Sequence, residues 1–140
     1  MANTLQGCRD ELLELIVIKN KLETVRSKLL PRAIRPTNIK VQVSAEDMFS
    51  EILALEMDME KQVMERCKVI VAHNKRARAA VDALPNWKHR YVLTLYYLTY
   101  YSVKGRRGLY TIPMIAQTMN FSEDHVKRIK REGIEKLATI

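Results

Sequence analysis

The sequence predicts an all-α fold in which a long antiparallel, coiled-coil-like helical hairpin precedes a C-terminal helix-turn-helix bundle. Apolar residues recur every three or four positions along most of the chain, and this spacing matches the period of a helix. Four Gly and four Pro among 140 residues are too few for a turn-rich β protein. A chain of this length can bury a core without disulfides or metal, and its two cysteines form no CxxC pair.

The first predicted helix covers residues 5–30. Lys and Glu fill one of its faces. The opposite face carries the apolar stripe Leu5, Cys8, Leu12, Leu15, Ile18, Leu22, Val25 and Leu29. Pro31 and Pro36 end this helix, because proline interrupts helical hydrogen bonding. The alternating apolar residues at 39–43 are a weak indication of a short extended segment.

A second helix is predicted to begin at the capping sequence Ser44–Asp47 and to continue without a break to Leu84, just before Pro85. Its apolar stripe consists of Met48, Ile52, Leu55, Met59, Val63, Cys67, Ile70, Asn74, Ala77, Val81 and Leu84. Such a helix would span about 58 Å at ~1.5 Å per residue, so we expect it to pair antiparallel with the first helix. Cys8 and Cys67 fall on this seam, where they are interpreted as buried packing residues.

Residues 86–101 are predicted to form a third helix, and a basic loop is predicted at 102–108. All six tyrosines of the chain lie between positions 91 and 110. Their rings form either an aromatic core with hydroxyls at the surface or a platform on which nucleic-acid bases stack.

The last thirty residues contain the pattern that points to a function. Thr111 caps a short helix that has Pro113 in its first turn. Asn120 tolerates the left-handed conformation of a tight turn, and Ser122 caps the helix that follows. A short helix, a three-residue turn and a helix with a basic outer face together form a helix-turn-helix.

The helix that opens at Ser122 is predicted to enter the major groove of duplex DNA with its N-terminal residues. Its candidate DNA-contacting residues are Ser122, Glu123, Asp124, His125, Lys127, Arg128, Lys130 and Arg131. Lys127 and Arg128 suit guanine edges or phosphates, and the two acidic side chains suit the cytosine amino group. Lys130 and Arg131 lie further along the helix and suit the DNA backbone. Acidic residues in a first turn also favour the helix dipole without any DNA, and a basic run is often a solvated face.

The charge distribution indicates an anionic partner for the C-terminal part. Residues 66–140 carry 15 basic and five acidic side chains, and such a surplus attracts polyanions, of which nucleic acid is the commonest. Residues 45–65 carry seven acidic and one basic side chain, and form either a partner surface or a solvated helix face. We therefore divide the chain into a helical hairpin for oligomerisation or partner binding at 1–84 and a DNA-binding domain at 85–140.

A family resemblance adds to this interpretation. The residues that carry it are Leu84-Pro85, Arg90-Tyr-Val-Leu93, Ile115-Ala-Gln-Thr-Met-Asn-Phe-Ser122, Val126, Ile129 and Ile134-Glu-Lys-Leu137. In this order they resemble region 4 of bacterial sigma factors, which reads the promoter −35 element through a helix-turn-helix. With its two long helices and the linker between them, the chain as a whole is similar to small phage and prophage transcriptional regulators of the ArpU-like kind.

The resemblance implies roles for particular residues. Base contacts are implied for Glu123, Asp124, Lys127 and Arg128, and a phosphate contact is implied for Thr111. The connection before Thr111 is longer and more basic than in sigma factors, which adds Arg106 and Arg107 as candidate DNA-backbone contacts. A −35-like sequence preference is not implied, because many sigma factors have a basic residue where this chain has Glu123.

We expect a sequence-specific, duplex-DNA-binding transcriptional regulator of the reducing cytoplasm, without cofactor or metal. RNA polymerase and a second copy of the chain, bound through the N-terminal helices, are further candidate partners. An enzyme is not expected, because the three His residues fit no metal-ligand spacing and no phosphate-binding glycine motif occurs. No membrane span is expected, since no apolar run approaches ~18 residues. No secretion signal is expected either, since the first residues form neither a basic region nor an apolar one. The alternatives are a phage DNA-packaging subunit of the small-terminase kind and a structural coiled-coil interaction module.

Overall fold

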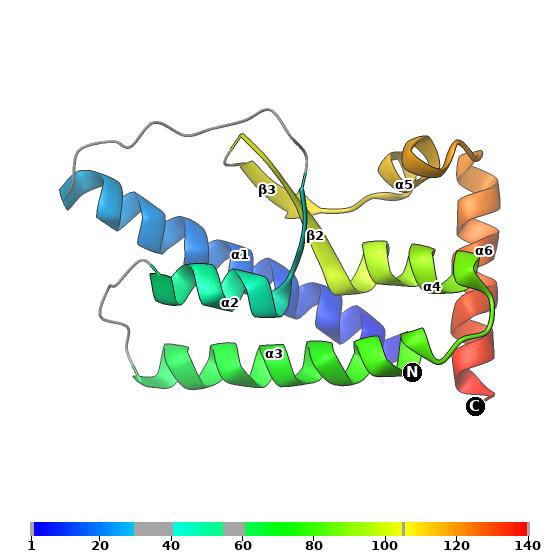
Figure 1. The fold of residues 1–140 in the computed structure, drawn as a ribbon, viewed down its shortest axis with the longest axis horizontal. Helices are drawn as coiled ribbons and strands as arrows, with labels where there is room; N and C mark the ends of the chain where they lie inside the picture. Colours follow the sequence, from blue (N-terminus) through cyan, green and yellow to red (C-terminus); the bar gives the residue numbers. More distant parts are fainter. Residues whose placement is uncertain (1, 30–40, 55–60, 105, 140) are drawn as a thin grey trace.

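Helices dominate the computed structural model, which describes residues 2–29, 41–54, 61–104 and 106–139 (Figure 1). The elements, in chain order, are α1 (Ala2–Leu29), β1 (Val41–Ser44), α2 (Ala45–Ala54), α3 (Lys61–Asp82), α4 (Trp87–Leu93), the π-helical turn η1 (Thr94–Leu98), β2 (Thr99–Val103), β3 (Arg106–Leu109), α5 (Ile112–Met119) and α6 (Glu123–Ala138). The predominantly α-helical class is therefore confirmed, with one small sheet added to it.

The N-terminal half is built on α1, which packs against both α2 and α3 (Figure 1). The predicted stripe of α1 is buried at Leu5, Cys8, Leu12 and Leu15, each no more than 2% exposed. Polar contacts show the direction of α3 relative to α1: Arg66 contacts Glu14, whereas His73, about two turns further along α3, contacts Glu11, which precedes Glu14 on α1. The two helices are therefore antiparallel.

The single long helix expected over 45–84 is wrong. Met48 and Ile52 of α2 lie in the same buried cluster as Cys67 and Ile70 of α3, so α2 and α3 lie side by side (Figure 1). In one continuous helix Met48 and Ile70 would be about 33 Å apart. Two helices side by side bury both apolar faces against α1, which a straight rod cannot do.

The start of α2 follows the sequence prediction. The backbone N–H of Asp47 donates to Ser44 Oγ over 3.2 Å, so Ser44 acts as the expected cap. Val41–Ser44 is extended as β1, in agreement with the weak signal there. Pro31, Pro36 and the expected stripe positions Leu55 and Met59 lie outside the described residues.

The third predicted helix, over 86–101, is confirmed from Trp87 to Leu98 but is wrong at its end, and strands replace most of the basic loop predicted at 102–108. The α-helix ends at Leu93, a π-helical turn follows, and the chain then continues as β2. β2 lies between β1 and β3, antiparallel to both, with Tyr100 opposite Val43 on one side and Leu109 on the other. The aromatic and β-branched residues Thr99–Val103 fit a pleated, half-buried surface, and the available pairing with β1 stabilises them as a strand.

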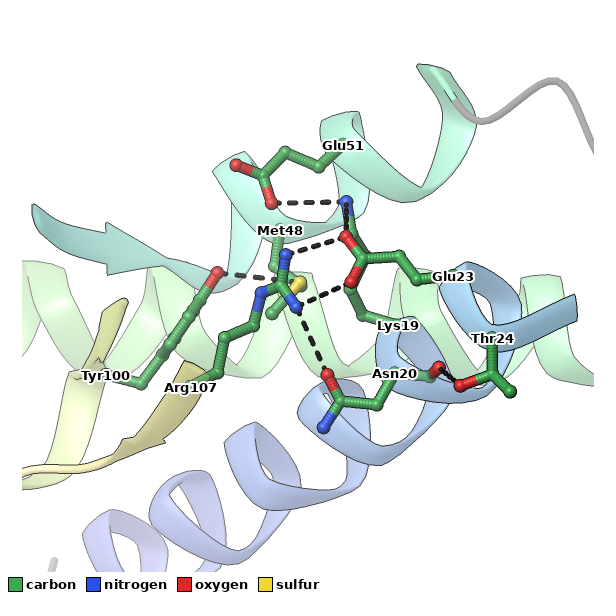
Figure 2. A network of polar contacts seen from close by, with 8 residues as sticks. All are labelled: Lys19, Asn20, Glu23, Thr24, Met48, Glu51, Tyr100 and Arg107. Carbon is green, nitrogen blue, oxygen red and sulfur yellow. Dashed lines mark hydrogen bonds and ion pairs between the residues drawn. The ribbon is translucent and has the colours of Figure 1, made fainter. Parts of the chain in front are cut away.

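The tyrosines serve mainly as core residues, the first of the two alternatives raised by the sequence. Tyr97, Tyr100 and Tyr110 are at most 5% exposed, while Tyr91 is 37% exposed. The hydroxyl of Tyr100 donates to the sulfur of Met48 over 3.5 Å (Figure 2). This contact links the sheet to α2.

The packing is continuous across the predicted boundary at 84/85. Leu5 and Cys8 of α1 and Val81 of α3 belong to the same buried cluster as Leu93 of α4 and Leu137 of α6. The division into two functional domains stays a prediction, but the two parts share one core.

Candidate nucleic-acid interface

The connection between α5 and α6 has the backbone geometry that the sequence predicts. Thr111 Oγ1 accepts a hydrogen bond from the backbone N–H of Met114 over 3.4 Å, and caps α5. Asn120 adopts the left-handed conformation at φ 59° and ψ 42°. The Ser122 hydroxyl then accepts from the backbone N–H of His125 over 3.2 Å and caps α6. Only three residues therefore separate the two helices.

An apolar cluster fixes the inner faces of both helices. Ile115 and Ala116 of α5 pack with Val126 and Ile129 of α6 over Val92 of α4. All five side chains are at most 5% exposed. Because this face of α6 is buried, the opposite face is held in one orientation toward solvent.

α6 also crosses α4 at close range (Figure 1). A Cβ added at Gly133 would lie 3.0 Å from Leu93 Cδ1 and 3.4 Å from His89 Cβ. The glycine inside α6 therefore marks close packing of this helix against α4. Glu132, the neighbouring residue, lies 3.5 Å from His89 Nε2.

The outer face of α6 is exposed and cationic. The side chains of Asp124, Lys127, Arg128 and Arg131 follow one another at helical spacing and line a shallow depression with Ser122. Within the described residues, no carboxylate lies within ion-pair distance of the three basic side chains. Cations without such partners are available to an external anion.

Two aromatic rings flank the start of α6. Arg128 Nη2 lies 2.7 Å from His125 Nδ1, and the His125 ring packs edge-on against Phe121 with centroids 4.7 Å apart. Lys88 of α4 places its ammonium 5.6 Å from the Phe121 ring. Sequence reasoning missed Lys88, since its nearness to the turn depends on how α4 packs against α6.

Lys130 does not belong to this outer face. It is half-buried, and its ammonium lies 4.3 Å from the ring centroid of Tyr96. The guanidinium of Arg9, from α1, lies 3.9 Å from the same ring, and it also donates to the Tyr96 carbonyl. Tyr96 therefore connects α1 to α6 through two cation–π contacts. No sequence signal marked Arg9, which is 87 positions away from its partner.

The two arginines of the β2–β3 hairpin differ in their surroundings. Arg106 is exposed, whereas the Arg107 side chain is only 8% exposed. Arg107 donates to both carboxylate oxygens of Glu23, over 2.7 and 2.9 Å, and to Asn20 over 3.1 Å (Figure 2). Burial lowers the pKa of Arg107, but the hydrogen bond and charge of Glu23 outweigh burial and raise it. Arg107 thus ties β3 to α1 and is not brought to the outer face of α6.

The remaining candidates keep exposed positions. Glu123 and Asp124 are exposed in the first turn of α6, and Thr111 is exposed at the start of α5. Of the residues predicted to contact DNA, the structure therefore brings most together at the turn and the outer face of α6.

No protein-family model, curated protein or solved structure matches the chain. Of the helices described, none is both long and apolar enough to cross a membrane. In the same part of the chain, no group of three or more His, Cys, Asp or Glu side chains is placed to hold a metal ion.

Proposed function

We propose that the chain is a sequence-specific duplex-DNA-binding transcriptional regulator in which α5 and α6 act as a helix-turn-helix. The observation that carries the proposal is the outer face of α6, where Lys127, Arg128 and Arg131 are exposed without carboxylate partners while the inner face is locked in the core. A major groove about 12 Å wide admits a helix in this orientation.

The order of side chains along α6 supports a division of roles. Asp124, Lys127 and Arg128 lie in the first two turns, the part of a recognition helix that meets base edges. Arg131, one turn further, suits a phosphate. Thr111 at the exposed start of α5 suits a phosphate on the other side of the groove, and Lys88 adds a cation near the turn.

The resemblance to sigma-factor region 4 and to ArpU-like phage regulators supports the same proposal, because those proteins use this motif on promoter DNA. RNA polymerase is the corresponding candidate partner.

Selection from a random duplex library tests the proposal, followed by fluorescence anisotropy on the selected duplex over a range of salt concentrations. Lys127→Ala or Arg128→Ala is expected to weaken binding by about 1–3 kcal/mol where the lost contact is a guanine edge. Where it is a phosphate, the salt slope falls by roughly one unit. Lys68→Ala is the matched control, because Lys68 is equally basic and exposed but pairs with Glu65 on α3.

Unchanged affinity and salt slope in both α6 variants would refute the role of α6. If no duplex is retained from the library, the proposal of DNA binding fails and a protein-interaction module takes its place.

A further inference from the structure

An apolar strip on α1 is left uncovered by the rest of the described chain. Leu13 and Val17 are 50% and 43% exposed, although the buried stripe of the same helix is almost completely covered. They lie four residues apart, on one face of α1. With Ile18 and Val63 they line a groove between α1 and α3. The four side chains form one contiguous apolar surface, and contiguous exposed apolar surface marks sites at which proteins bind one another.

Opposite charges stand at the two ends of this strip. Asp10 lies one turn before Leu13, Lys21 lies one turn after Val17, and both line the same groove. Eleven residues separate them, about 16 Å along the helix, so they cannot pair within one chain. Among the described residues, Asp10 accepts a hydrogen bond from a neutral donor, Gln6 Nε2, over 3.1 Å, and its charge also acts on the neighbouring Arg9. Within the described residues no carboxylate lies within ion-pair distance of Lys21.

The other charges at this groove are already neutralised inside the chain. Glu14 and Arg66 form an ion pair with 3.0 Å between Oε2 and Nη2. The charge that remains for a partner is therefore negative at the Asp10 end and positive at the Lys21 end.

We propose that this face binds a second copy of the chain, with α1 packed antiparallel on α1 about a two-fold axis between Leu13 and Val17. The axis places Leu13 of one copy on Val17 of the other. It also brings Asp10 within one residue, about 1.5 Å along the helix, of the position opposite Lys21 of the partner. A parallel pair would oppose Asp10 to Asp10 and Lys21 to Lys21, and like charges repel. The proposal is independent of DNA binding.

Sedimentation velocity over a concentration series, without DNA, measures the association. Leu13→Ser is expected to raise the dimer Kd roughly tenfold or more, because the two-fold axis removes the side chain twice. Leu53→Ser is the matched control, since Leu53 is also 50% exposed but lies on α2 outside the groove. Circular dichroism checks that both variants keep their helices.

Charge reversal tests the antiparallel arrangement. Asp10→Lys and Lys21→Glu are each expected to weaken the dimer, because each places like charges across the axis. The double variant restores opposite charges and is expected to regain association. Rescue must act between copies, since the two positions are three helical turns apart within one chain.

A wild-type chain that stays monomeric at every concentration would overturn the proposal. So would a dimer that none of the variants affects, or a higher oligomer in place of a dimer. Weak single variants without rescue in the double variant would overturn the antiparallel pairing. Because no DNA is present, these results are separate from the outcome of the DNA-binding tests.

Discussion

Arg106 and Arg107 are neighbours in sequence whose side chains have different surroundings. Arg107 is held between Glu23 and Asn20, and Lys19 also lies 3.5 Å from Glu23 (Figure 2). Arg107→Ala is expected to lower the free energy of unfolding by about 3 kcal/mol, the lower end of the range for a buried pair, because Lys19 still compensates Glu23. Urea denaturation measures this change.

Arg106→Ala is the control for that substitution. Arg106 is exposed, so the stability of this variant is expected to match the wild type. If Arg107→Ala instead keeps full stability and lowers only the affinity for DNA, its assignment to the fold is wrong.

Cys8 gives the stability of the protein a dependence on alkaline pH. Burial, together with the nearby charge of Glu11, raises the pKa of Cys8 from 9.0 to about 11. The unfolded chain therefore loses this proton first. The contribution of Cys8 to stability is complete below pH 9.0 and decreases as the pH rises through about 11.

Denaturation curves recorded across this pH range measure the effect. The free energy of unfolding is expected to decrease toward high pH, and to decrease less in Cys8→Ala. Burial also raises the pKa of Cys67 and Tyr97, so part of the decrease is expected to remain. Identical pH slopes for the variant and the wild type would contradict the role of Cys8.

At the scale of elements, two helical glycines provide a comparison of packing. A Cβ at Gly7 of α1 would meet nothing within 4 Å, whereas a Cβ at Gly133 of α6 would lie 3.0 Å from Leu93 Cδ1. Gly7→Ala is expected to stabilise the protein by up to ~1 kcal/mol through helix propensity. Gly133→Ala is expected to lose this gain, because Leu93 is fully buried and must shift.

Thermal unfolding of the two variants measures the difference directly. Equal stabilisation by both would mean that α4 and α6 have room for a methyl group at Gly133, in contradiction to the 3.0 Å approach of Leu93 Cδ1.

The elements that sequence reasoning predicted correctly depend on local chemistry. Ser44, Thr111 and Ser122 cap their helices by accepting from a backbone N–H three residues further along the chain. Asn120 takes up the left-handed conformation within its own turn. Such features need only a few consecutive residues, so their pattern can be recognised in the sequence.

The elements that were missed depend on distant partners. α2 and α3 pack on each other as separate helices, and β2 forms where Tyr100 pairs with Val43, 57 positions earlier. The periodicity of these segments is compatible with a helix, and only the tertiary pairing selects the strand. In the candidate site, the helical spacing of Lys127, Arg128 and Arg131 was enough to predict that they share the outer face of α6. That Lys130 and Arg107 lie away from this outer face could not be predicted, because it depends on where the fold places Tyr96 and Glu23.

At the scale of the whole molecule, the proposed dimer and the proposed DNA-binding function together predict the symmetry of the DNA site. A two-fold axis relates two copies of α6, so the selected duplexes are expected to contain two half-sites as an inverted repeat. Sequencing of the selected library measures this symmetry. Asp10→Lys is expected to reduce the preference for two half-sites over one, while Lys127→Ala weakens binding to both. A single asymmetric site bound at full affinity would contradict the paired arrangement.

The core shared across residues 84 and 85 restricts how such a protein can evolve. Leu5 and Cys8 of α1 lie in the same buried cluster as Leu93 and Leu137. Residues 85–140 transferred without α1 would therefore expose an apolar surface. A recombination event that exchanges residues 85–140, the proposed DNA-binding part, would therefore have to carry α1 with it. If α6 reads DNA as proposed, a new sequence preference is reached more easily by substitutions on its exposed face than by exchange of whole segments.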